Sequence, residues 1–192
     1  MNRIVDFVLE LEKLKAVTRK TKPLGLDRYE NSAEHSWQIA LFAAAAAPYA
    51  DAPVDVDRVI RMLLVHDIGE IDTGDTMVYE QGGWSERQAA ELAAVTRIFG
   101  LLPPSEAEPF IALWREFNEG LTAESRFAQA IDRAMPVLLN LANDGQSWRE
   151  HGISYARVVA RCEGQIRSGS PALWNHIAVR LAEARDLGWF GS

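Results

Sequence analysis

The sequence predicts an all-α protein, and three observations lead to this expectation. Apolar residues recur at intervals of three and four through most of the 192 residues, as they do on one face of a helix. Capping and proline-rich strings stand where such segments would start, and a glycine-containing string stands where one would stop. No segment alternates apolar and polar residues convincingly enough to predict a half-buried strand.

The first half of the chain predicts three helices. The first carries apolar residues at helical spacing: Ile4, Phe7, Val8, Leu11 and Leu14. The second begins after Asn31, which caps it and forms a capping box with Glu34, and it ends in the segment 48–55. The third covers residues 55–69, and residues 70–83 are expected to form a loop because they contain Thr-Gly-Asp and Gly-Gly.

The second half predicts five further helices, over residues 84–99, 104–119, 123–143, 150–167 and 171–187. The string PPSEAE at 103–108 is a strong helix start, and NDG at 143–145 is a plausible stop. A length of 192 residues, without an internal repeat or a low-complexity linker, is typical of one domain. We therefore expect residues 1–192 to form a single helical domain.

Composition and charge exclude several classes of protein. The formal net charge is −7 and the only basic cluster is RKTK at 19–22, so a DNA- or RNA-binding face is not expected. Cys162 is the only cysteine, which excludes an intrachain disulfide and a cysteine-rich metal site. The N-terminal segment mixes acids with its apolar residues, and the longest apolar run, near 39–47, is too short to cross a bilayer. We expect a soluble, cytoplasmic protein with no membrane partner.

Four polar residues stand where helical spacing predicts core-facing positions or the end of an apolar helix. His35, His66 and Asp132 face inward from three different expected helices, and Asp67 follows His66 directly. Taken singly, each of them is more often a hydrogen-bonded core residue or an exposed helix end than a ligand. Together, two imidazoles and two carboxylates form a mixed N/O set that suits a divalent metal, and a metal would neutralise the buried carboxylates.

Three strings resemble the HD-domain phosphohydrolases, whose pattern is H…HD…D. They are ENSAEHSW, HDIGEIDTGD and AIDRAMPVLLN, in this order and at these distances. They look like the branch that contains the bacterial 5′-deoxynucleotidases and HD-domain-containing protein 2. The resemblance spans about residues 4–145, and the helices expected at 150–187 carry no recognised motif. It implies a single HD-domain helical bundle.

The resemblance also implies roles for individual residues. The metal ligands would be His35, His66, Asp67 and Asp132. Glu70 and Asp75 match two acidic catalytic positions, and Arg19 matches an arginine that contacts the substrate phosphate. Without the resemblance, other interpretations fit these residues. Glu70 is then equally well explained as a solvated acid at a helix end, Asp75 as a turn residue and Arg19 as part of a surface cluster. The deoxynucleotidases have a tryptophan directly after that arginine, whereas this chain has Lys20, so the sugar preference stays open.

The function implied is that of a metal-dependent phosphohydrolase acting on (deoxy)nucleoside 5′-monophosphates. Two alternatives remain, namely an HD-type phosphodiesterase or (p)ppGpp hydrolase, and a non-catalytic module that binds metal or nucleotide. The ligand set suits one divalent ion, which can be Mn, Co, Fe, Ni, Zn or Mg. The resemblance also suggests a homodimer. Asp72 has no assigned role, and Trp84 either packs or covers the pocket.

Overall fold

The computed structural model of this chain describes residues 1–77, 79 and 83–191, and it confirms the all-α expectation. In the described part the only extended pairing is an isolated bridge between Thr18 and Asn31. The α-helices are α1 (Asn2–Leu11), α2 (Ser32–Ala46), α3 (Val56–Val65), α4 (Glu70–Thr73), α5 (Trp84–Phe99), α6 (Pro104–Glu119), α7 (Ala123–Ala142), α8 (Gln146–Glu150), α9 (Tyr155–Gly169) and α10 (Pro171–Asp186). Two short 3₁₀ helices are η1 (Glu12–Ala16) and η2 (Ala47–Tyr49).

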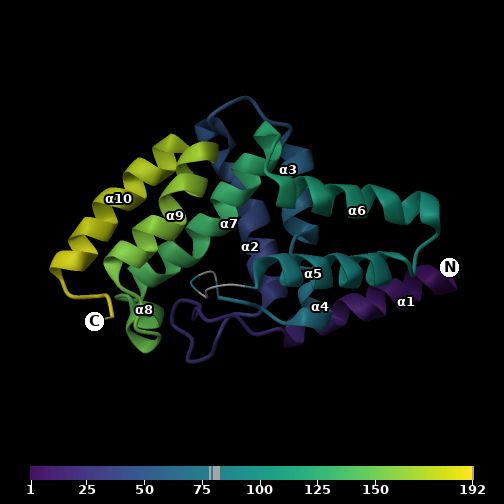
Figure 1. The fold of residues 1–192 in the computed structure, drawn as a ribbon, viewed down its shortest axis with the longest axis horizontal. Coiled ribbons are helices and arrows are strands. Elements are labelled where there is room, and N and C mark those ends of the chain that lie inside the picture. Colours follow the sequence, from purple (N-terminus) through teal and green to yellow (C-terminus); the bar gives the residue numbers. More distant parts are fainter. Residues whose placement is uncertain (78, 80–82, 192) are drawn as a thin grey trace.

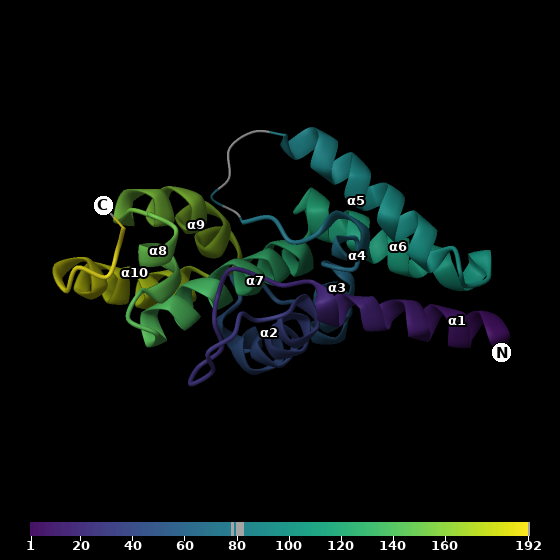
Figure 2. The same cartoon turned by 90° about the horizontal axis from the view of Figure 1, so that it is seen from below.

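Helix α7 lies in the middle of the bundle (Figures 1 and 2). It contacts α9 and α10 on one side and α2, α3 and α6 on the other. Its apolar residues accordingly divide between two clusters of buried side chains. Ile131 and Leu139 belong to a cluster shared with α2, α3, α5 and α6, whereas Ala134 and Val137 belong to one shared with α9 and α10. Helix α7 therefore joins the two clusters.

The expected helix over residues 55–69 is wrong at its C-terminal end. Helix α3 stops at Val65, and the following residues form tight turns with hydrogen bonds of the i→i+3 kind, such as Glu70 N to Asp67 O at 3.0 Å. A separate short helix, α4, then begins at Glu70 inside the expected loop 70–83. The tighter turn changes the direction of the side chains after Val65, which a continuous helix would have placed at regular 3.6-residue spacing. Residues 78 and 80–82 of that loop lie outside the described part.

Two other boundaries differ from expectation. The first helix ends at Leu11 and continues as η1, so Leu14 is buried from a 3₁₀ turn. The helix expected at 150–167 begins later, at Tyr155 of α9, and it follows the short helix α8 and a turn in which Gly152 has a φ of 60°. Ser154 then caps α9 by accepting a hydrogen bond from Arg157 N, which fixes the new start. The capping box of Asn31 with Glu34 and the proline start of α6 are confirmed.

The described residues contain no helix of the length and apolarity that a bilayer crossing requires.

Gly169→Ala is expected to lower the free energy of unfolding by about 1–3 kcal/mol, because the added methyl group would collide with α7. A Cβ atom at Gly169 would lie 2.7 Å from the Cβ of Ala130 and closer still to the carbonyl oxygen of Arg126. Gly164→Ala in the same helix is the matched control, since nothing lies within 4 Å of its added Cβ. It should raise stability by up to about 1 kcal/mol through helix propensity. Urea unfolding followed by circular dichroism measures both, and equal losses would contradict the close-packing explanation.

Candidate functional site

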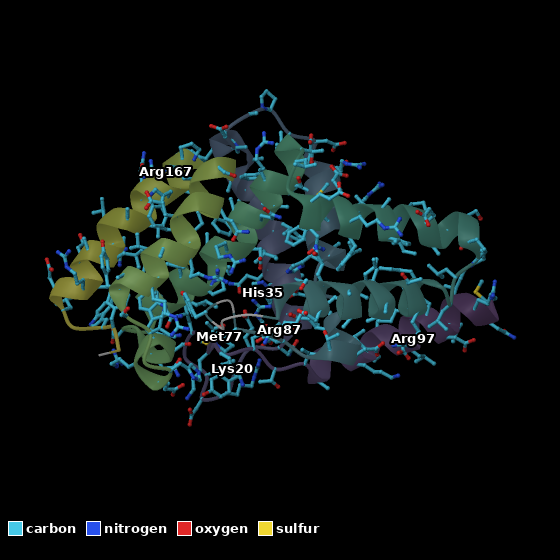
Figure 3. All side chains as sticks on the ribbon, in the orientation of Figure 1. Lys20, His35, Met77, Arg87, Arg97 and Arg167 are labelled. Atoms are coloured by element: carbon cyan, nitrogen blue, oxygen red, sulfur yellow. The ribbon has the colours of Figure 1, made fainter. Side chains whose placement is uncertain are left out.

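Five of the polar residues singled out in the sequence line one pocket of about 160 Å³, namely Arg19, Asp67, Glu70, Asp75 and Asp132. Its walls come from Arg19 to Thr21, from the turn that carries Asp67 and Glu70, from residues 75–77, and from one side of α7. Tyr79, Ser147 and Cys162 complete it. Figure 3 labels His35 near the middle of the molecule, with Met77 and Lys20 nearby in this view. The pocket thus lies in the central part of the bundle, beside α7.

Three of the four predicted metal ligands form one compact group. His35 from α2, His66 at the end of α3 and Asp132 from α7 each offer a ligand atom, and these atoms lie within 4.8 Å of one another. Asp132 Oδ1 is shared, since it lies 3.0 Å from His35 Nε2 and 3.5 Å from His66 Nε2. The group thus joins three helices, and its two outermost members, His35 and Asp132, are 97 positions apart in the sequence.

The surroundings of His66 leave one of its nitrogens in need of a cation. Its Nδ1 lies 2.8 Å from the carbonyl oxygen of Leu63, so Nδ1 must carry the hydrogen and donate it. In the neutral ring Nε2 is then an acceptor, yet its neighbours are carboxylate oxygens of Asp67, at 2.9 Å, and Asp132. This buried Nε2 has no hydrogen-bond partner. An acceptor facing acceptors is stabilised only by a positive charge between them, either a proton or a metal ion.

The rest of the protein holds His66 in this orientation. The imidazole packs against the ring of Phe117 with centroids 5.0 Å apart, and the indole of Trp114 donates to the His66 carbonyl at 3.1 Å. Burial lowers the pKa of His66, but the two carboxylates outweigh this and raise its pKa well above the usual value. The ring therefore has little freedom to turn away from the carboxylates.

Asp67 lies beside this group and is shared with an arginine. Its Oδ1 contacts His66 Nε2, and its Oδ2 accepts a hydrogen bond of 2.9 Å from Arg19. Burial raises the pKa of Asp67, but His66 and Arg19 lower it to below its ordinary value. For Arg19, burial lowers the pKa, and Asp67 and Asp75 together raise it. The predicted fourth ligand and the predicted phosphate-binding residue are thus in direct contact, from positions 48 residues apart.

Glu70 is a buried acid with one well-defined partner. The hydroxyl of Ser32, at the first turn of α2, donates to Glu70 Oε2 at 2.6 Å. Burial is the main cause of a pKa of Glu70 well above the ordinary value, and the charge of Asp67 adds to it. The alternative of a solvated helix-end acid is therefore wrong, because only 9% of the residue is exposed. A carboxyl group with a raised pKa in a pocket suits proton transfer near neutral pH.

Asp75 lines the same pocket as Glu70 and directly follows Gly74. Its side chain is 9% exposed and lies 3.8 Å from Arg19. Burial raises the pKa of Asp75, and the charge of Arg19 opposes this without cancelling it. The pocket therefore offers two carboxyl groups with raised pKa values on different backbone segments.

Sequence reasoning missed Glu30, which supports two of these residues. It is 2% exposed, and its Oε2 lies 3.4 Å from His35 Nδ1 and 3.5 Å from Arg19 Nε. The hydroxyl of Thr21 donates to the same oxygen at 3.3 Å. A carboxylate on the outer nitrogen of a metal-binding histidine typically orients the ring. Position 30 falls before the helix cap, where no periodicity indicates which way a side chain points.

Other conspicuous polar residues lie outside the pocket. Asp72 pairs with Arg97 at 2.7 Å, and Arg97 also pairs with Glu10, so Asp72 joins α4 to α5 and α1. Figure 3 labels Arg97 at the end of the molecule where α1 and α5 lie. Glu34 completes its capping box and pairs with Arg28. The side chain of Trp84 lies outside the part that the structure describes.

The donor set fits a divalent metal. Two imidazole nitrogens and carboxylate oxygens converge, one nitrogen is buried without a hydrogen-bond partner, and the neighbouring carboxylates supply negative charge. Such N/O sets bind several first-row transition metals and also the harder Mg²⁺.

Comparison with known proteins agrees with this chemistry. Residues 11–174 match the HD domain family. The 5′-deoxynucleotidase HDDC2 of Xenopus laevis is 28% identical over 113 residues, which cover 59% of this chain and 55% of that protein. For the protein of the same name from Homo sapiens the identity is 27%, with 59% and 54% covered. The chain thus spans about half the length of these curated relatives.

A solved structure matches over the whole length. The crystal structure of a predicted metal-dependent phosphohydrolase from Magnetospirillum magnetotacticum MS-1 has a TM-score of 0.92 and 40% sequence identity. The match covers 100% of this chain and 98% of that chain. The similarity therefore includes the C-terminal helices, in which the sequence shows no recognised motif.

Proposed function

This chain belongs to the HD domain family, and we propose that it is a metal-dependent phosphohydrolase. The substrate class that fits best is a small phosphate monoester, a nucleoside 5′-monophosphate or its deoxy form, as the names of its relatives suggest. One observation carries the proposal: Asp132 of the compact His/Asp group lines the same pocket as an arginine and two buried acids with raised pKa values.

His35, His66 and Asp132 would hold the metal, with Asp67 as the fourth ligand. The resemblance suggests this set, and the shared contacts of His66 and Asp132 support it. A bound divalent ion would lower the pKa of a water molecule and screen the charge of the phosphoryl group, which otherwise hydrolyses extremely slowly. The metal can be Mn, Co, Fe, Ni, Zn or Mg, because ligand type alone does not select among them.

The other pocket residues would handle the proton and the phosphate. Glu70, held by Ser32, would accept a proton from the attacking water. Asp75, on a different segment, would deliver a proton to the leaving oxygen. Arg19 would present its planar fork to phosphate oxygens, while its Nε stays paired with Glu30. Two buried acids in one pocket favour catalysis over a module that only binds metal or nucleotide.

Metal analysis followed by a substrate screen tests the proposal. The purified protein, loaded in turn with each of the six metals, should release phosphate from nucleoside 5′-monophosphates in a metal-dependent way. Cyclic nucleotides and (p)ppGpp are the comparison substrates, and faster cleavage of either would favour the alternative HD-type activities. Nucleotide binding without turnover under every metal would favour the non-catalytic module and contradict the proposal.

We also propose that the chain forms a homodimer, as the resemblance suggests. Helix α2 and the turn after it carry large exposed apolar side chains, with Trp37 at 62%, Leu41 at 56% and Tyr49 at 62% exposed. These three side chains bear no charge, so the surface that they form could pack against the same surface of a second copy without charge repulsion. Light scattering after size-exclusion chromatography measures the mass of the assembly and so tests the dimer.

The cytoplasmic location remains a prediction, which cell fractionation would test.

A further inference from the structure

The pocket continues along α7 beyond the His/Asp group. Arg133, Pro136, Val137 and Asn140 all line it, and their spacing of three and four places them on one face of the helix. From Arg133 to Asn140 this face is about 10 Å long at 1.5 Å per residue. The pocket is therefore longer than a phosphate group needs. Along this face the cation Arg133 is followed by the apolar Pro136 and Val137 and then by the polar Asn140.

Arg133 differs from Arg19 in its surroundings. The guanidinium of Arg19 contacts Asp67, Asp75 and Glu30, so acids already balance its charge. Arg133 makes no ion pair with any described residue, and its Nε is buried without a hydrogen-bond partner. A partly buried guanidinium without a carboxylate is costly unless an anion or several acceptors face it. Within the described pocket lining, the charge of Arg133 is thus available to a ligand.

The electric field of Arg133 acts on Tyr79 and Cys162, which also line the pocket. Burial raises the pKa of both Tyr79 and Cys162, and the positive charge of Arg133 works against burial at each of them. The charge of Arg19, by contrast, lowers the pKa of Asp67, Glu70 and Asp75. The buried hydroxyl of Ser147, which also lines the pocket beside Asn140, has no hydrogen-bond partner. The two arginines therefore serve different parts of one pocket.

We propose that Arg133 binds a second anionic group on the leaving group of the substrate. The substrate class is then a phosphate monoester with a second phosphate, of which a nucleoside 3′,5′-bisphosphate is the simplest nucleotide. The inference rests on the proposed phosphohydrolase function, because it assumes that the scissile phosphate lies at the His/Asp group. Attack of water on the 5′-phosphorus would break its bond to the 5′-oxygen. Inorganic phosphate and a nucleoside 3′-monophosphate, protonated at the 5′-oxygen, would be released.

The apolar middle of the pocket fits the rest of such a substrate. Pro136, Val137 and Met77 offer a wall for the nucleoside, and Ser147 offers an unpartnered hydroxyl at its end. The Asn140 side chain is already used, because its Oδ1 accepts from Ser147 N and its Nδ2 donates to the Pro136 carbonyl. Arg133 thus provides the only unpaired charge along this face of α7 in the described residues.

Steady-state kinetics on two substrates tests the assignment. With one metal throughout, kcat/KM is measured for 2′-deoxyadenosine 5′-monophosphate and for its 3′,5′-bisphosphate. The wild-type protein should prefer the bisphosphate. Arg133→Gln should lower kcat/KM for the bisphosphate by about 10- to 100-fold, mostly through KM, which is the range for a hydrogen bond to a charged group. It should change the value for the monophosphate by less than about threefold, and Arg133→Lys should be intermediate.

Arg126→Gln is the matched control, because Arg126 lies on the same helix but outside the pocket and donates to the Leu121 carbonyl. It should leave both substrates unchanged. Equal losses on both substrates for Arg133→Gln, or no loss on either, would overturn the proposal, and unfolding curves show that the variant is folded. If the wild-type protein cleaves neither substrate, the proposed function fails instead. Calorimetric affinity for the bisphosphate then still decides whether Arg133 binds the second phosphate.

Discussion

Asp132→Ala is expected to remove the bound metal and to lower phosphatase kcat/KM by about three orders of magnitude, equivalent to several kcal/mol of lost transition-state stabilisation. The reason is that Asp132 Oδ1 lies between the two histidines, 3.0 Å from one and 3.5 Å from the other. Its loss removes a ligand and leaves both buried imidazoles without their shared carboxylate. Elemental analysis of the purified variant and phosphate release under saturating metal measure the two effects.

Asp72→Asn is the matched control for this prediction. Asp72 belongs to the same acidic string as Asp67, but it pairs with Arg97 on the surface. Exposed ion pairs contribute at most about 1 kcal/mol, so stability should fall slightly while metal content and activity stay unchanged. An Asp132→Ala protein with stoichiometric metal and normal turnover would show that the ligand assignment is wrong.

Glu70→Gln is expected to lower kcat by about 10²- to 10⁴-fold while metal content stays at the wild-type value. The substitution preserves the size of the side chain and an oxygen for the hydroxyl of Ser32, but it removes the group that can accept a proton. The raised pKa of Glu70, caused first by burial and then by Asp67, places proton transfer closer to neutral pH. Single-turnover kinetics with metal-loaded protein separates this effect from weaker substrate binding.

Asp75→Asn provides the comparison that separates the two acids. If Asp75 protonates the leaving oxygen, its loss should impair cleavage of nucleoside monophosphates but largely spare p-nitrophenyl phosphate, whose leaving group needs no proton. Glu70→Gln should impair both substrates to a similar extent, because both need an activated water. The opposite pattern would exchange the two roles.

Local sequence patterns were sufficient to predict most of the helices. Helix boundaries at residues 84–99 and 104–119 agree with α5 and α6, because capping and periodicity depend on hydrogen bonds within a few residues. The predicted helices are wrong where tight turns replace regular α-helical hydrogen bonding. The turn after Val65 and the break before Tyr155 interrupt helices that periodicity alone would continue.

The candidate site was predicted as a set of residues, and its contacts were not. Helical spacing indicated that His35, His66 and Asp132 face inward, and the resemblance named the acids and Arg19. Neither helical spacing nor the resemblance indicated that Arg19 would contact Asp67 or that Ser32 would donate to Glu70. The residues of these two pairs are 48 and 38 positions apart in the chain. These contacts depend on how the N-terminal segment and α2 pack against the turn after α3.

By itself, the sequence determined the helical class and the types of donor available, because both follow from local periodicity and from residue chemistry. Only the tertiary structure decided which charges are balanced. It buries Glu30 between His35 and Arg19, joins Asp72 to Arg97, and leaves Arg133 without an ion-pair partner among the described residues. Charge balance depends on distances between segments far apart in the chain, and packing of the helices around α7 fixes those distances.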